Sequence, residues 1–203
     1  MKIPQICLLF SVLSGALLFT GCTSYQIGNT QTRDINQYAN SVNIQGVSAA
    51  ADLYATEAKT KEGFYVNLTE RDYYPVQLVI QNDGADTILL LKSDIAISDA
   101  SGNEYKPVNA AVMVDEFEHN KMAYALLGFG IFSYMSADDA NKKMAADWHS
   151  KELNDETIIN TSRKNSGFVY FKMPKGMKPN GMTLKLKLED LQTKAKLDFK
   201  VRM

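Results

Sequence analysis

Short runs of alternating apolar and polar residues restrict the fold of this 203-residue chain more than any other feature. In Val76–Ile80, apolar residues stand at every second position, and alternate side chains of a strand point to opposite faces. The turn residues Asn82–Gly84 then predict a hairpin, and Asp99–Asn103 predict a second tight turn. Further strands are predicted at 88–91, 95–97, 104–108, 168–170, 184–188 and 195–201. Short strands separated by turns favour an antiparallel sandwich or barrel.

Four stretches carry a family resemblance: VQLVIQNDG from Val76, ISDASGNEYKPV from Ile97, GFVYFKMPKG from Gly167 and MTLKLKL from Met182. Together they resemble the immunoglobulin-like domains attached to many bacterial envelope lipoproteins. The resemblance implies a mainly β chain whose residues 46–203 form an immunoglobulin-like antiparallel β-sandwich. It implies no function, because such sandwiches have many roles.

A helical insertion is expected within that domain, at about 109–155. Ala110–Glu118 and Ser136–Leu153 have helix-like composition, with Ser136 as the predicted N-cap. Met122–Met135 between them is uncharged, but its 14 residues are too few to cross a bilayer, which takes about 20. Two interpretations stay open: the apolar run covers the open end of the sandwich, or it is exposed to a partner protein or to lipid. The candidate interface residues are Leu126, Leu127, Phe129, Ile131 and Phe132.

The N-terminus has the pattern of an exported, lipid-modified protein. Lys2 precedes the apolar run Ile6–Phe19, which has the length of a signal-peptide core. The following residues, Leu18-Phe19-Thr20-Gly21-Cys22, resemble the lipobox of bacterial lipoproteins, with Phe19 where leucine is commoner. The resemblance implies that residues 1–21 are a signal peptide and that Cys22 is lipidated. Residues 22–45, rich in Thr, Ser, Asn and Gln, are predicted to form a flexible tether.

The residue after the lipidated cysteine predicts which membrane of the envelope holds the lipid anchor. By the sorting rule known for such proteins, Thr23 in place of aspartate implies the outer membrane of a bacterial envelope. We expect the domain to face the periplasm, although the sequence leaves the choice of leaflet open. Membrane contact through the lipid, together with an envelope protein partner, is the expected set of interactions.

The charge of the chain and its distribution limit the classes of partner that we expect. The formal net charge of −1 and a pI near 6.1 argue against a nucleic-acid partner. The last strands are nonetheless basic, and the basic residues that alternate with apolar ones should line one solvent face. That face either protects the sheet edge from pairing or contacts an anionic surface. Its members are Lys185, Lys187, Lys196, Lys200 and Arg202.

Catalytic motifs give no support for an enzyme. The chain has no Gly-x-Ser-x-Gly elbow, no His-Glu-x-x-His and no phosphate-binding glycine loop, and both cysteines precede the domain. We therefore expect a non-enzymatic binding or structural module without a cofactor. The alternative is a metal-dependent hydrolase, because acidic residues and the two histidines cluster at helical spacing. Its ligands would come from Asp115, Glu116, His119, Asp147 and His149.

Overall fold

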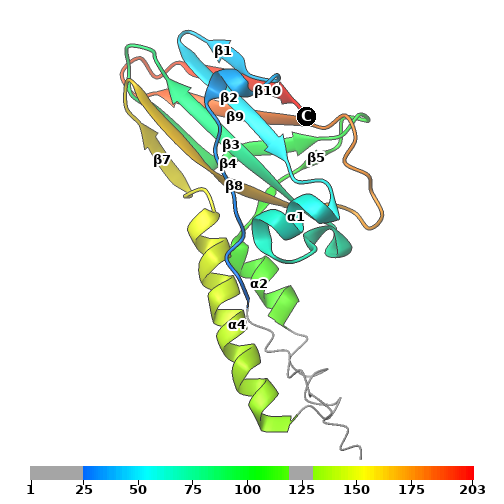
Figure 1. Cartoon of the computed structure of the whole chain (residues 1–203). Helices are drawn as coiled ribbons and strands as arrows, with labels where there is room; N and C mark the ends of the chain where they lie inside the picture. The colour runs from blue at the N-terminus through cyan, green and yellow to red at the C-terminus, as the bar shows by residue number, and fades with distance from the viewer. Residues whose placement is uncertain (1–24, 119–129) are drawn as a thin grey trace, which may run out of the picture.

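The computed structural model describes residues 25–118 and 130–203, and for residues 130–137 it describes the backbone alone. Two antiparallel sheets and three α-helices make up the described chain, together with two short 3-10 helices (Figure 1). The prediction of a mainly β chain with antiparallel sheets and an inserted helical region is confirmed.

The first sheet, sheet A, has the strand order β1-β2-β3-β8-β6. Its strands are β1 (Val42–Ile44), β2 (Val47–Leu53), β3 (Tyr73–Asn82), β8 (Arg163–Lys172) and β6 (Pro107–Val108). The ten-residue register between β3 and β8, from Tyr73 opposite Lys172 to Asn82 opposite Arg163, forms its centre.

The second sheet, sheet B, has the order β10-β9-β4-β5, and β7 pairs with the first residues of β4, on the same edge as β5. Its strands are β4 (Ile88–Ser98), β5 (Glu104–Tyr105), β7 (Glu156–Ile159), β9 (Thr183–Asp190) and β10 (Lys196–Arg202). The β9–β10 hairpin is fully in register from Thr183 opposite Arg202 to Glu189 opposite Lys196. It confirms the strands predicted there.

The main core lies between the two sheets. Val76, Leu78 and Ile80 of β3 face Leu184, Leu186 and Leu188 of β9 across it, and all six side chains are at most 1% exposed. The alternation in the sequence therefore marks the residues that both sheets bury against each other.

A second core lies on the other face of sheet A, where the helices pack. The helical elements are η1 (Ile35–Gln37), α1 (Glu57–Phe64), η2 (Leu68–Arg71), α2 (Ala110–Glu118) and α4 (Gly130–Lys151). Helices α1, α2 and α4 bury the side chains of Phe64, Met113 and Trp148, respectively. These side chains pack against Phe168 and Tyr170 of β8. The aromatic rings meet edge to face, as with Phe64 and Phe168 at 5.0 Å between centroids.

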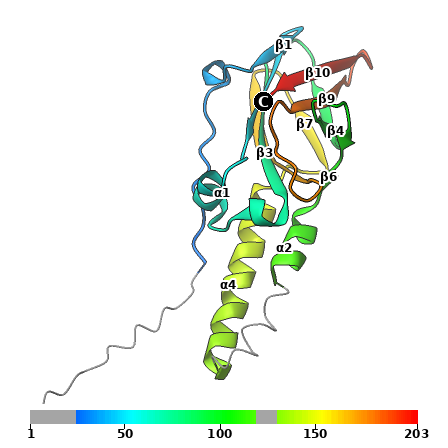
Figure 2. The same cartoon turned by 90° about the vertical axis from the view of Figure 1, so that its right-hand side faces the viewer.

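Helix α4 extends well beyond this second core. Its C-terminal part supplies Met144 and Trp148 to the core. Its N-terminal part projects away from both sheets, past the end of α2, in both views of the molecule (Figures 1 and 2). No helix of the described residues is long and apolar enough to cross a membrane.

The residues before the sheets are also part of the fold. The N-terminal segment, defined as Tyr25–Tyr38, runs over the outer face of sheet A (Figures 1 and 2). Thr32 Oγ1 lies 3.2 Å from Ser166 Oγ of β8 and accepts a hydrogen bond from Gln77 Nε2 of β3 at 3.2 Å. Tyr38 is buried with Ala50 and Val79. The predicted flexible tether is thus corrected for the described part, because these contacts hold the segment against the domain.

Two local expectations are wrong. Asn82–Gly84 does not close a hairpin, because β3 belongs to sheet A and the next strand, β4, to sheet B. The strands predicted at 88–91 and 95–97 are one strand, β4, whose register against β9 shifts between Leu90 and Ile95.

In the insert, α2 has the predicted bounds, whereas α4 begins at Gly130, so Ser136 lies inside the helix and is not its N-cap. Helix α2 and the C-terminal part of α4 cover the outer face of sheet A. The apolar run Met122–Met135 lies outside the described residues up to 129, and only its backbone is described after that.

Candidate functional site

The predicted lipidation site, Cys22, lies outside the described residues, and the chain is described from Tyr25, three residues later. The Tyr25 hydroxyl donates to Asp147 Oδ2 of α4 at 2.6 Å and lies 2.9 Å from the carbonyl oxygen of Phe64. It accepts a hydrogen bond from Trp148 Nε1 at 3.1 Å. The first described residue is therefore attached to both α1 and α4.

Lys151, one turn after Asp147 on α4, completes this arrangement. Its ammonium group lies 2.7 Å from Asp147 Oδ2 and donates to the carbonyl oxygens of Gly63 at 2.7 Å and Gly28 at 3.1 Å. Both partners of the ion pair are shielded, with side chains 10% and 2% exposed. One buried cation thus joins the N-terminal segment, the end of α1 and the end of α4. We call Tyr25, Asp147, Trp148 and Lys151 the anchor seat.

Close backbone contact explains why glycines stand at this point. A side-chain carbon on Gly28 would lie 2.2 Å from the carbonyl carbon and oxygen of Gly63, which leaves no room for any other residue. Asn29 N–H donates to the Glu62 carbonyl at 2.9 Å beside it. The segment can lie this close to α1 only because Gly28 lacks a Cβ, whereas a Cβ on Gly63 would instead lie 2.7 Å from the Tyr54 ring.

The electrostatics of the anchor seat favour a structural role. Burial, followed by the neighbouring Asp147 carboxylate, raises the pKa of the Tyr25 hydroxyl far above its ordinary value. Tyr25 is therefore neutral over the whole physiological range and serves as a hydrogen-bond donor to a paired carboxylate. A group with that pKa is poorly matched to general acid–base work near neutral pH.

The five candidate interface residues fall mostly outside the description. Leu126, Leu127 and Phe129 lie outside the described residues, while Ile131 and Phe132 lie in the first turns of α4, where the backbone alone is described. The structure thus places the last two on the projecting part of α4.

The residues proposed as metal ligands have separate partners. Glu116 pairs with Lys172 and Asp147 belongs to the anchor seat, while His149 lies 3.7 Å from Glu152. Asp115 has an interaction partner as well, and His119 lies outside the described residues. Within the described ranges, no group of three acidic, histidine or cysteine residues is placed to hold a metal ion.

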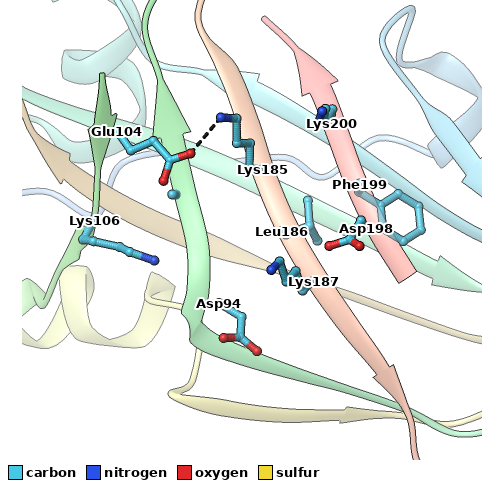
Figure 3. A pocket seen from close by; sticks show the side chains of 10 residues that line it. Asp94, Glu104, Lys106, Lys185, Leu186, Lys187, Asp198, Phe199 and Lys200 are labelled. Atoms are coloured by element: carbon cyan, nitrogen blue, oxygen red, sulfur yellow. Dashed lines mark hydrogen bonds and ion pairs between the residues drawn. The ribbon is translucent and has the colours of Figure 1, made fainter. Parts of the chain in front are cut away.

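The five basic residues predicted to share a face lie on the outer surface of sheet B, on β9 and β10. We call this surface, formed by outward side chains of β4, β5, β9 and β10, the charged face (Figure 3). A shallow depression of about 390 Å³ lies at its centre, between the basic residues and the carboxylates of Asp94, Glu104 and Asp198.

Carboxylates neutralise part of the charged face. Lys185 Nζ lies 2.7 Å from Glu104 Oε1, the pair marked in Figure 3, and Lys196 pairs with Glu189. Lys185 lowers the pKa of the Glu104 carboxyl below its ordinary value. Lys187, Lys200 and Arg202 form no ion pair with any described residue. The face therefore presents both charge signs, with three unpaired cations.

The anchor seat escaped the sequence analysis. Asp147 and Lys151 stand four apart on a predicted helix, a spacing that permits an ion pair, but the nearby histidine and acidic residues make Asp147 a candidate metal ligand instead. Tyr25 stood in a polar stretch without periodicity. The available signal is an aromatic residue three positions after the proposed lipidation site.

Comparison with known proteins gives limited information. No family model matches the chain, and no curated protein matches its sequence. Two solved structures from Bacillus subtilis resemble it at 12% identity. The yjhA protein matches over 81% of this chain and 97% of its own, with a TM-score of 0.41. A protein named "putative lipoprotein (ycdA)" matches over 80% of this chain and 38% of its own, with a TM-score of 0.42. Likenesses of this size carry no conclusion about function.

Proposed function

We propose that the chain is a membrane-anchored envelope lipoprotein that acts as a non-enzymatic binding module. The observation that carries the anchor is the sequence Leu18–Cys22, which ends an apolar run and lies three residues before the anchor seat. A lipid on Cys22 would be attached directly to a folded domain. Thr23 supports the outer membrane as its location, with the domain in the periplasm.

Cleavage and acylation test the anchor. Wild-type protein from cells fed a labelled fatty acid should carry the label, begin at Cys22 by mass and sediment with membranes. The variant Cys22→Ser should lose the label and the membrane association. An unlabelled wild-type protein that begins elsewhere would contradict the proposal.

The charged face supports binding through protein contacts. It is the open outer surface of sheet B, whereas helices and the N-terminal segment cover the corresponding surface of sheet A. Surfaces that carry both charge signs select partners with the complementary pattern and speed their encounter. The finer fold assignment, an immunoglobulin-like sandwich, belongs to the same proposal and is supported by the two antiparallel sheets that share one core.

Crosslinking in living cells tests the partner. Photoreactive residues at Lys187 and Lys200 should give a specific protein adduct, and the control is Lys61 on α1, which pairs with Glu57 four residues before it. The same adducts from Lys61, or none from any position, would argue against a partner at the charged face.

A second candidate function is binding to an anionic lipid surface through the same face. It is favoured by the three unpaired cations, which attract an anionic surface over a Debye length of roughly 8 Å at physiological salt. The domain without its lipid should then bind anionic vesicles, lose binding as salt rises and ignore neutral vesicles. Absent or salt-independent binding would exclude this candidate.

A further inference from the structure

We propose that the first turns of α4 rest in the lipid leaflet that holds the acyl chains of Cys22, with Ile27 and Tyr65 toward the headgroups of the same leaflet. This inference rests on the proposed anchoring and names the surface that the domain turns toward its membrane. We call it the membrane-facing end.

The short link between the anchor seat and Cys22 is the first argument. Three residues span at most about 11 Å when fully extended. Asp147, the hydrogen-bond partner of Tyr25, stands 17 residues after Gly130, which corresponds to about 25 Å along the helix. The acylated cysteine can therefore be no further than about 11 Å from Tyr25. The first turns of α4 lie beyond the anchor seat on the side away from the sheets (Figures 1 and 2).

The charge pattern of α4 is the second argument. Residues 130–137 carry no charge, and charged residues begin at Asp138 and Asp139. Asp138 pairs with Lys142 at 2.7 Å, one turn further toward the sheets. The uncharged part measures about 12 Å, close to half of a hydrocarbon core of about 30 Å. The first turn of a helix has unpaired N–H groups, so this piece suits the interfacial part of one leaflet, which headgroups and water reach, rather than a full crossing.

Exposed apolar side chains beside the anchor seat are the third argument. In the described ranges only four large apolar side chains are strongly exposed, among them Ile27 at 76% and Tyr65 at 47%. Ile27 stands two residues after Tyr25, and the Tyr65 ring lies 5.7 Å from the Tyr25 ring. Tyrosine is enriched where proteins meet the headgroup region, since its ring is apolar and its hydroxyl polar.

A lipid leaflet fits this end better than a protein partner does. The link from the anchor seat to the acylated cysteine keeps Ile27 and Tyr65 within a few residues' reach of the bilayer. A partner bound there would have to fit between the domain and its own membrane.

Site-specific fluorescence tests the inference, because the mature chain has no cysteine other than Cys22, which the lipid occupies. The lipidated full chain is placed in vesicles of phosphatidylethanolamine and phosphatidylglycerol. An environment-sensitive dye is attached to Ile131→Cys or Ile27→Cys. The matched control is Ile158→Cys on β7, an isoleucine that is 56% exposed in sheet B. Unfolding curves confirm that each variant is folded.

Dyes at Ile131 and Ile27 should lose emission when spin-labelled lipid is added, while the dye at Ile158 keeps its emission. Equal quenching at all three positions would overturn the inference. So would a dye at Ile131 that is equally shielded without vesicles, since that residue would then pack against protein. The mass of the same sample separates the two claims: without acyl chains the anchoring fails, whereas acylated protein without quenching removes the membrane-facing end alone.

Discussion

The outer faces of the two sheets differ in how much of each is covered. On sheet A, the β3 residues Tyr73–Ile80 are all buried, because the sandwich core covers one face and helices with the N-terminal segment cover the other. On sheet B, exposed and buried residues alternate strictly along β10. A strand buried on both faces thus sits in the same domain as strands with one solvated face.

The difference assigns separate tasks to the two faces. The outer face of sheet A, which we call the covered face, holds the anchor seat, so it connects the domain to its proposed lipid. The charged face keeps its side chains in water, so it stays available to a partner. Four predictions test this division, and they run from the largest expected effect to the smallest.

Removal of the central side chain of the covered face should cost most. Trp148→Ala leaves a cavity among α1, α2, α4 and sheet A, where Trp148 is fully buried. We expect a loss of about 4 kcal/mol in the free energy of unfolding, measured by urea denaturation. Lys200→Ala on the charged face is the control and should change stability little. Similar losses in both variants would remove the distinction between the faces.

Loss of the buried cation should come next. Lys151→Met leaves the shielded Asp147 carboxylate without its charge partner, and we expect a destabilisation of about 3 kcal/mol. Lys142→Met, which breaks an exposed pair with the same spacing, is the matched control. Limited proteolysis should also cut the N-terminal segment faster in Lys151→Met. Unchanged stability and cleavage would mean that the segment is held by other contacts.

Titration of groups on the two faces should lower the free energy of unfolding at opposite ends of the pH scale. Burial raises the pKa of Tyr54, on the covered face, from 10.0 to about 12. Its contribution is complete below pH 10 and disappears as pH rises toward 12. On the charged face, lysines lower the pKa values of Glu104 and Glu189. Their contribution is present above the ordinary glutamate pKa and is lost as pH falls through the lowered values.

Unfolding curves across this pH range, with tyrosinate absorbance as a second signal, measure both effects. We expect the larger loss at alkaline pH, since the acids are solvated. An alkaline loss of stability that is unchanged in Tyr54→Phe would contradict the assignment of that loss to Tyr54.

The smallest effect should come from the ion pair on the charged face. Lys185→Ala, Glu104→Ala and the double variant form a cycle whose coupling energy should be small and should vanish at high salt. A large, salt-resistant coupling would show that the pair is structural, and the charged face would then resemble the covered one.

The sequence predicted the part of the fold that depends on alternation. The apolar residues of β9 and β10 are recognisable because their burial follows a period of two. Those of β3 are recognisable because Val76, Leu78 and Ile80 stand at every second position, although both faces of that strand are buried. The turn residues Asn82–Gly84 predict a hairpin after β3, but the same residues also suit a chain that crosses to the other sheet. The sequence therefore does not distinguish the two connections. Asn82 in fact donates to the Asp86 and Ile159 carbonyl oxygens at this crossing.

The covered face was less predictable for a physical reason. Its helices and N-terminal segment are held by single contacts between residues far apart in the chain, as with Tyr25 and Asp147, 122 residues apart. Such contacts leave no periodic pattern. The polar composition of residues 22–45 predicts a tether. One buried tyrosine and a few hydrogen bonds nevertheless suffice to hold the described part of this segment against the domain.

The anchor seat also determines how the molecule would bear a mechanical load. If a force pulls on the lipid, it enters the domain at Tyr25, where the hydroxyl contacts with Asp147, Trp148 and Phe64 and the adjacent Lys151 contacts resist it together. The remaining segment would peel from sheet A only after that point yields. Tension would then lengthen the connection to the membrane in one abrupt step rather than gradually.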